Sequence, residues 1–108
     1  FEMAEEIEEI PLNDDVRELV NGVLEKSSEL DDMIAKYSKK RAFSRIAKIN
    51  IAVLRIAFYE ILYNDKIPTN AAVHEAVLLA QNYSYKEDVS FVNGILGVYT
   101  RSLESEEN

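Results

Sequence analysis

The segment Val53–Leu62, VLRIAFYEIL, is apolar at almost every position and carries only two charged side chains, Arg55 and Glu60. A helix at the surface of a domain has one apolar stripe, whereas a helix that is apolar on every side is surrounded by protein. We therefore predict a central helix over Ile46–Tyr63. The side chains expected to be mostly buried are those of Leu54, Ile56, Ala57, Phe58 and Ile61.

Apolar residues also recur at steps of three and four before this segment. From Val16 to Ile34 this spacing predicts a long amphipathic helix, which Ser27-Ser28 interrupts and divides. A short helix at Glu2–Glu9 would end before Pro11. The basic stretch Tyr37–Arg45 is predicted as a turn with a short helical piece.

Two more helices are predicted after the central one. Pro68 suits the start of an alanine-rich helix over Asn70–Gln81. Ser84–Asp88 is predicted as a loop, and Ser90 or Asp88 as the cap of a last helix. Gly94 and Gly97 lie inside that helix, where we attribute them to close packing against a neighbour. No segment predicts a strand, so the expected fold is a single all-α domain of about five helices spanning residues 1–108.

Composition narrows the setting of this domain. The 108 residues include no cysteine, which excludes disulfides and thiolate zinc sites. No apolar run reaches the roughly 18 residues that would span a bilayer, and the acidic start is unlike a signal peptide. We expect a cytoplasmic protein that does not enter the membrane.

Charge is distributed unevenly along the chain. The net charge is −8, yet residues 33–59 contain seven basic residues and no acidic one. A chain this acidic should not coat nucleic acid indiscriminately, although a local basic patch can still guide a phosphate backbone. Basic side chains interleaved with aromatic ones, such as Tyr37 and Phe43, are typical of single-stranded RNA binding. The alternative is that the basic stretch is a solvated helix end and that the aromatic rings belong to the core, which we favour for Phe43.

Residues with catalytic chemistry are nearly absent. His74 is the only histidine, so the chain contains no histidine-based triad and no two-histidine metal site. The three glycines are predicted inside helices and form no phosphate-binding loop. We expect neither an enzyme nor a protein that needs a metal or other cofactor.

The order VLRIAFYEIL, a short loop ending in Ile67-Pro68, HEAVLLA and then FVNGIL (Phe91–Leu96) resembles the NusB family. The resemblance runs from about Val16 to Leu103. NusB is an all-helical transcription antitermination factor. The resemblance implies that the chain pairs with NusE, a small-subunit ribosomal protein, and that the pair binds the boxA element of ribosomal RNA leaders. Other Nus factors and RNA polymerase would be further partners.

The resemblance also implies which residues make these contacts. The start of the central helix, at Lys48 and Asn50, would lie on the NusE-binding side. Asn50 stands where the family often has an acidic residue. The residues expected near the RNA are Tyr37, Lys39, Lys40, Arg41, Glu87, Ser90 and Phe91.

The beginning of the chain departs from the family pattern. A full NusB starts with an arginine-rich helix that carries much of the RNA affinity, and nothing before Val16 resembles it. We expect the groove left by such a helix to favour a homodimer or the capture of another helix. Two other functions stay open, namely an accessory domain of a ribosomal RNA methyltransferase and a purely structural helical interaction domain.

Overall fold

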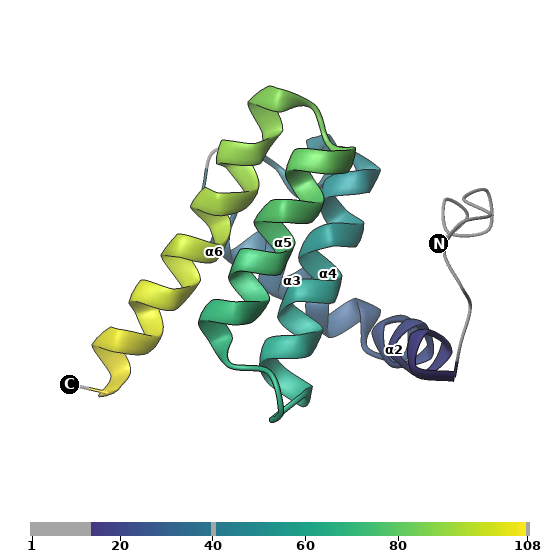
Figure 1. The fold of residues 1–108 in the computed structure, drawn as a ribbon. Helices are drawn as coiled ribbons and strands as arrows, with labels where there is room; N and C mark the ends of the chain where they lie inside the picture. Colours follow the sequence, from purple (N-terminus) through teal and green to yellow (C-terminus); the bar gives the residue numbers. More distant parts are fainter. Residues whose placement is uncertain (1–13, 40, 108) are drawn as a thin grey trace.

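The structure, a computed structural model, describes residues 14–39 and 41–107. In that part of the chain it contains helices and connecting loops but no strand, as the sequence predicts (Figure 1). The predicted helix at Glu2–Glu9 lies outside the described residues. The elements are α2 (Asp14–Glu25), α3 (Ser27–Tyr37), the 3-10 helix η1 (Phe43–Arg45), α4 (Lys48–Tyr63), α5 (Thr69–Tyr83) and α6 (Lys86–Glu107).

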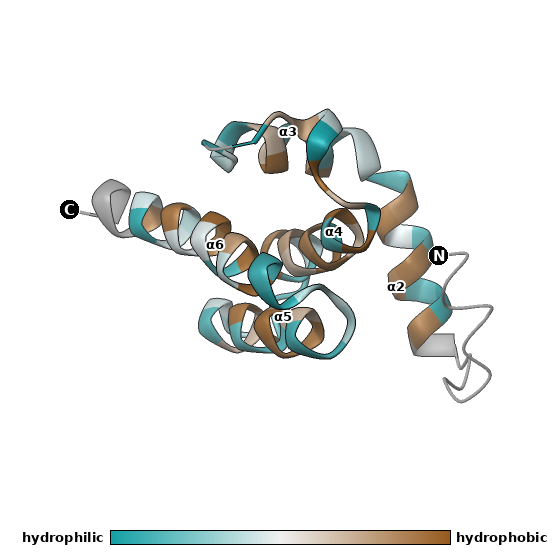
Figure 2. Ribbon diagram, turned by 90° about the horizontal axis from the view of Figure 1, so that it is seen from above, coloured by the Kyte–Doolittle hydropathy of each residue, from teal (hydrophilic) through white to brown (hydrophobic). Residues whose placement is uncertain are grey.

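Helix α4 is the central element, and it contacts α2, α3, α5 and α6. In Figure 2 apolar residues continue along α4 and cover the side of α3 that faces it. Leu54, Ala57 and Phe58 are buried, which confirms this part of the prediction, while Ile56 and Ile61 are half-buried and pack against the core. The predicted central helix is therefore present, with Leu54, Ala57 and Phe58 in the core.

Two charged side chains in the middle and second half of this helix, Arg55 and Glu60, have different neighbours. Arg55 donates two hydrogen bonds to Asp31 of α3, from Nε and Nη2, each 2.7 Å long. These bonds raise the pKa of the Arg55 guanidinium, so it stays charged. Glu60 instead lies near Glu75 of α5, and partial burial followed by repulsion from that carboxylate raises the pKa of Glu60.

The helix boundaries agree with the sequence-based prediction between α2 and α3 but differ from it at the start of α6. The chain breaks between α2 and α3 at Lys26, next to the Ser27-Ser28 pair. The last helix, however, starts at Lys86, so only Ser84 and Tyr85 form the loop that was expected to reach Asp88. Asp88 and Ser90 are already inside α6, and the prediction that one of them caps this helix is wrong.

The predicted reason for the two glycines of α6 is also wrong. A Cβ at Gly94 would meet no heavy atom within 4 Å, and one at Gly97 would meet only the guanidinium of Arg101. Close helix packing occurs instead at Gly22 of α2, where a Cβ would collide with the ring and hydroxyl of Tyr59. Glycine at position 22 therefore allows α2 to approach α4.

Candidate functional site

A groove of about 470 Å³ lies between the end of α3 with the loop that follows it and residues 87–101 of α6. It brings together six of the seven residues expected near RNA. These are Tyr37, Lys39, Arg41, Glu87, Ser90 and Phe91. The seventh, Lys40, lies outside the described residues. Residues almost fifty positions apart in the sequence thus line one groove.

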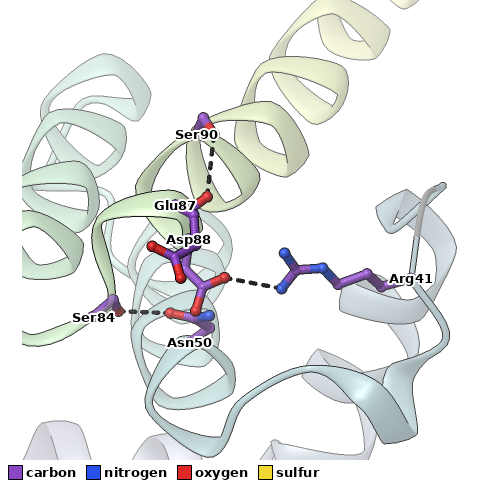
Figure 3. Close-up of polar contacts among 6 residues, drawn as sticks. All are labelled: Arg41, Asn50, Ser84, Glu87, Asp88 and Ser90. Atoms are coloured by element: carbon purple, nitrogen blue, oxygen red, sulfur yellow. Dashed lines mark hydrogen bonds and ion pairs between the residues drawn. The ribbon is translucent and has the colours of Figure 1, made fainter.

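Arg41 is the best anchored cation of the groove. Its guanidinium lies 4.2 Å from the centre of the Phe91 ring, which is a cation–π contact. The same guanidinium donates a 3.1 Å hydrogen bond from Nη1 to Oδ1 of Asp88 (Figure 3). Asp88 is buried in the first turn of α6, so a charged pair joins the loop to the helix start. The Phe91 ring therefore supports a guanidinium plane on one side.

Two serines stabilise the backbone around this cation. Ser38 donates a 2.6 Å hydrogen bond to the carbonyl oxygen of Arg41, which closes the turn after α3. Ser90 donates a 3.3 Å hydrogen bond to the carbonyl oxygen of Glu87 inside the first turns of α6. Lys39, Glu87 and Ser90 are exposed at the groove. Their side chains reach solvent, as contact with a ligand requires.

Tyr37 forms the wall between the groove and the core. Its ring stacks on Phe58 at 6.3 Å between centroids and meets the Tyr99 ring edge-on at 5.3 Å. Phe58 and Tyr99 also meet edge-on, at 5.2 Å, so the three rings form one cluster. Tyr37 and Phe91 are both half-buried, line the groove and pack against the core. Each ring thus packs against the core on one side and lines the groove on the other.

The two residues expected on the partner-binding side have opposite surroundings. Lys48 is exposed at the first position of α4. Asn50 is fully buried, which corrects the expectation that it lies on a contact surface. Its Oδ1 accepts a 2.6 Å hydrogen bond from Ser84 in the loop between α5 and α6, while its Nδ2 has no hydrogen-bond partner (Figure 3). Asn50 thus joins the start of α4 to this loop and is not available for direct contact.

Four residues of α6 also line the groove but were not expected there, namely Gly94, Ile95, Val98 and Arg101. Phe91, Gly94, Val98 and Arg101 follow one another at steps of three, four and three residues along α6. Such steps place side chains on one face of a helix. This spacing was visible in the sequence and would have identified Arg101 as a third basic residue of the groove, besides Lys39 and Arg41.

Other kinds of site find no support in the described ranges 14–39 and 41–107. They contain no group of three or more histidine, aspartate or glutamate side chains that could hold a metal ion. None of their helices is long and apolar enough to cross a membrane. His74 is exposed on α5.

Residues 2–101 match the NusB family. Transcription antitermination protein NusB of Acetivibrio thermocellus is 44% identical over 110 residues, which cover 94% of this chain and 76% of that protein. The chain belongs to the NusB family. The family match begins at residue 2, so it reaches further toward the start than the resemblance drawn from Val16 onward. The membership also confirms that the chain is not an enzyme, because NusB is a non-catalytic transcription antitermination factor.

Further relatives agree in sequence and in fold. NusB of Ruminiclostridium cellulolyticum is 45% identical over 96 residues, covering 87% of this chain and 66% of that protein. The solved structure of T. maritima NusB is 36% identical, with a TM-score of 0.72, and the match covers 77% of this chain and 58% of that one. This likeness confirms the all-α fold. The chain spans between 58% and 76% of the length of these NusB proteins.

Proposed function

We propose that the chain acts in transcription antitermination by pairing with NusE and binding boxA RNA, together with other Nus factors on RNA polymerase. The observation that carries the proposal is the gathering of six residues expected near RNA around one groove. Family membership supports the antitermination role. The groove supports the RNA role, since it combines cations for phosphates with planar groups for bases.

The surroundings of Arg41 refine how a base would bind. The Phe91 ring already carries the Arg41 guanidinium on one face. RNA bases stack on guanidinium planes as well as on aromatic rings. A base can therefore stack on the outer side of Arg41, while Phe91 supports the guanidinium from below and Asp88 holds it from the side. In this arrangement Phe91 contributes to binding by keeping Arg41 in place.

Fluorescence anisotropy with a labelled boxA oligonucleotide, at several salt concentrations and with and without NusE, tests the proposal. We expect weak binding by the chain alone and tighter binding with NusE. Phe91→Ala should weaken binding by about 1–3 kcal/mol, the usual value of one stacked base. Lys39→Ala should lower the slope of log affinity against log salt by about 0.7, since one phosphate contact is lost.

Lys66→Ala is the matched control for Lys39→Ala. Lys66 is equally exposed but follows the far end of α4, away from the groove. Its removal should leave the salt slope unchanged. If Phe91→Ala and Lys39→Ala both bind as the parent does at every salt concentration, the RNA role of the groove is wrong and a purely structural interaction domain becomes the better hypothesis.

The NusE surface is tested through Lys48, the exposed member of the predicted pair. Lys48→Glu should weaken the binding of labelled NusE, because it reverses a charge at the start of α4. Lys66→Glu makes the same change about 24 Å away, at the other end of a sixteen-residue helix. Equal affinity of both variants would move the NusE surface elsewhere.

A further inference from the structure

Gly94 occupies a position where neither the backbone nor the packing calls for glycine. It lies in the middle of α6, and no glycine among the described residues has a positive φ. Glycine is also one of the poorest residues in a helix interior. A Cβ at this position would have no heavy atom within 4 Å. What the missing side chain leaves is open space in the groove that Gly94 lines.

Arg101 brings a positive charge to the same part of the groove. Its guanidinium folds back along α6 toward Gly97, with Nη1 3.4 Å from the place that a Cβ there would take. Lys39 and Arg41 lie at the other end, where Arg41 covers Phe91. The groove therefore has cations at both ends, and the stretch of α6 between them includes Gly94, where no side chain fills the space.

The lining between these cations is mainly apolar. Ile95 and Val98 contribute aliphatic surface, and Phe91 contributes a ring. Among the residues that the structure describes, Glu87 is the only acidic one that lines this groove, in a chain whose net charge is −8. An occupant that is flat and apolar in the middle and negatively charged at its edges fits this pattern. A nucleotide of single-stranded RNA has this character, because its base is planar and its phosphates are anionic.

We propose that the space over Gly94 accepts one unstacked base of single-stranded RNA and that Arg101 binds the phosphate next to it. The inference rests on the proposed RNA function and adds a base position and a phosphate-binding residue to it. The groove volume of about 470 Å³ falls in the range of pockets that hold small organic ligands. Glycine at position 94 thus determines how much room the base has.

The substitution Gly94→Ala separates binding from folding. Because nothing crowds the new methyl group, alanine should raise the Tm by a few degrees through its better helix propensity. The same methyl group enters the space of the base, so affinity for the RNA oligonucleotide should fall about fivefold, and Gly94→Leu should lower it further, about tenfold or more. Tighter folding with weaker binding excludes unfolding as the cause.

Asn93→Ala is the matched control for the glycine variants. Asn93 is the neighbouring residue on α6, is exposed and does not line the groove. Alanine there also improves helix propensity, so it should preserve or raise the Tm without changing RNA affinity. A loss of affinity in this control as large as that of Gly94→Ala would overturn the assignment of a base to the space over Gly94.

The phosphate contact is tested by Arg101→Gln, measured by anisotropy across a series of salt concentrations. The slope of log affinity against log salt should fall by about 0.7. Arg17→Gln removes the same charge from an exposed position on α2, outside the groove, and should leave the slope unchanged. Equal slopes for the two variants would show that Arg101 acts only through the overall charge, and would overturn its role.

The parent chain distinguishes the failure of this inference from the failure of the proposed function. If the parent binds the oligonucleotide and Gly94→Leu binds equally well, the base position is wrong while the RNA function stands. If the parent does not bind RNA with or without NusE, the proposed function itself fails. If Gly94→Leu weakens NusE binding and leaves RNA binding intact, the groove holds a protein segment and the inference is overturned.

Discussion

Helices α4 and α6 contain the two apolar strings that identify the family, yet they are used differently. Helix α4 contacts four other helices, and its side chains Leu54 and Phe58 have no exposed surface. Helix α6 has the same kind of buried side, at Val92 and Leu96, but its other side lines the groove. Helix α4 therefore serves mainly to hold the fold together. In α6, some residues of the string FVNGIL are buried in the core and others line the groove.

The division within FVNGIL explains how a short string can have two roles. Val92, Ile95 and Leu96 are buried, whereas Phe91 is half-buried and Gly94 is exposed. Neighbouring residues of a helix point about 100° apart, so a string of six residues samples both sides. Substitutions at the buried positions should therefore change stability, and substitutions at Phe91 and Gly94 should change binding.

The largest effect is expected at the centre of α4. Phe58→Ala should lower the free energy of unfolding by about 3–5 kcal/mol, because it removes a fully buried ring and leaves a cavity next to Tyr37 and Tyr99. Thermal melting measures the loss. A shift of the Tm by only a degree or two would mean that α4 is not the central helix of the domain.

Arg41→Ala should break the separation between stability and binding. It leaves the buried carboxylate of Asp88 without its ion-pair partner, so the free energy of unfolding should fall by about 1–3 kcal/mol. It also removes a cation from the groove, so RNA affinity should fall in the same variant. Denaturant unfolding and anisotropy measure the two effects.

Arg45→Ala is the control for this double effect. Arg45 belongs to the same connection between α3 and α4, but its side chain is exposed. Its removal should change the stability by no more than about 0.5 kcal/mol. An equal loss of stability in both variants would mean that the Arg41–Asp88 pair contributes nothing beyond general charge.

The smallest effect is expected from Glu60, an acidic residue of α4 that lies near Glu75. Its pKa is raised by partial burial and by Glu75, so the folded state penalises the ionised form. A pKa that is higher in the folded than in the unfolded state makes stability fall as the pH rises above the unfolded value of about 4.3. Glu60→Gln should therefore raise the Tm slightly at pH 7 and lose this advantage near pH 4.

The pH dependence of melting checks this sign, with Glu18→Gln as the comparison. Glu18 is exposed on α2. Its replacement should change the Tm by a similar small amount at pH 7 and pH 4. A gain from Glu60→Gln that persists unchanged at acid pH would show that the effect comes from packing and not from the carboxylate charge.

Much of the fold could be predicted because local signals and packing agree. The apolar segment around Phe58 predicted the buried central helix, and Ser27-Ser28 predicted the break between α2 and α3. The residues of the groove came from the family resemblance. Periodicity alone places Phe91 on a helix but cannot show that the loop residue Arg41 packs on its ring, since that contact joins positions fifty residues apart.

The errors have identifiable physical causes. Asn50 stands between two isoleucines, and a polar residue in such a setting is compatible with an interface or with a buried hydrogen bond. The donor that decides the matter, Ser84, is thirty-four residues away and gives no local signal. Gly94 was assigned to helix packing because that is a common use of helical glycine, whereas the close approach in this fold occurs at Gly22.

The position of Tyr37, in both the groove and the core, links ligand binding to the unfolding equilibrium. Its ring is part of the groove and of the cluster with Phe58 and Tyr99, so the groove exists only while that cluster is intact. A ligand that binds only the folded state adds stability by mass action, about 2.7 kcal/mol at a hundredfold excess over Kd. A partner that fills the groove would therefore protect the core from thermal unfolding without touching most of it.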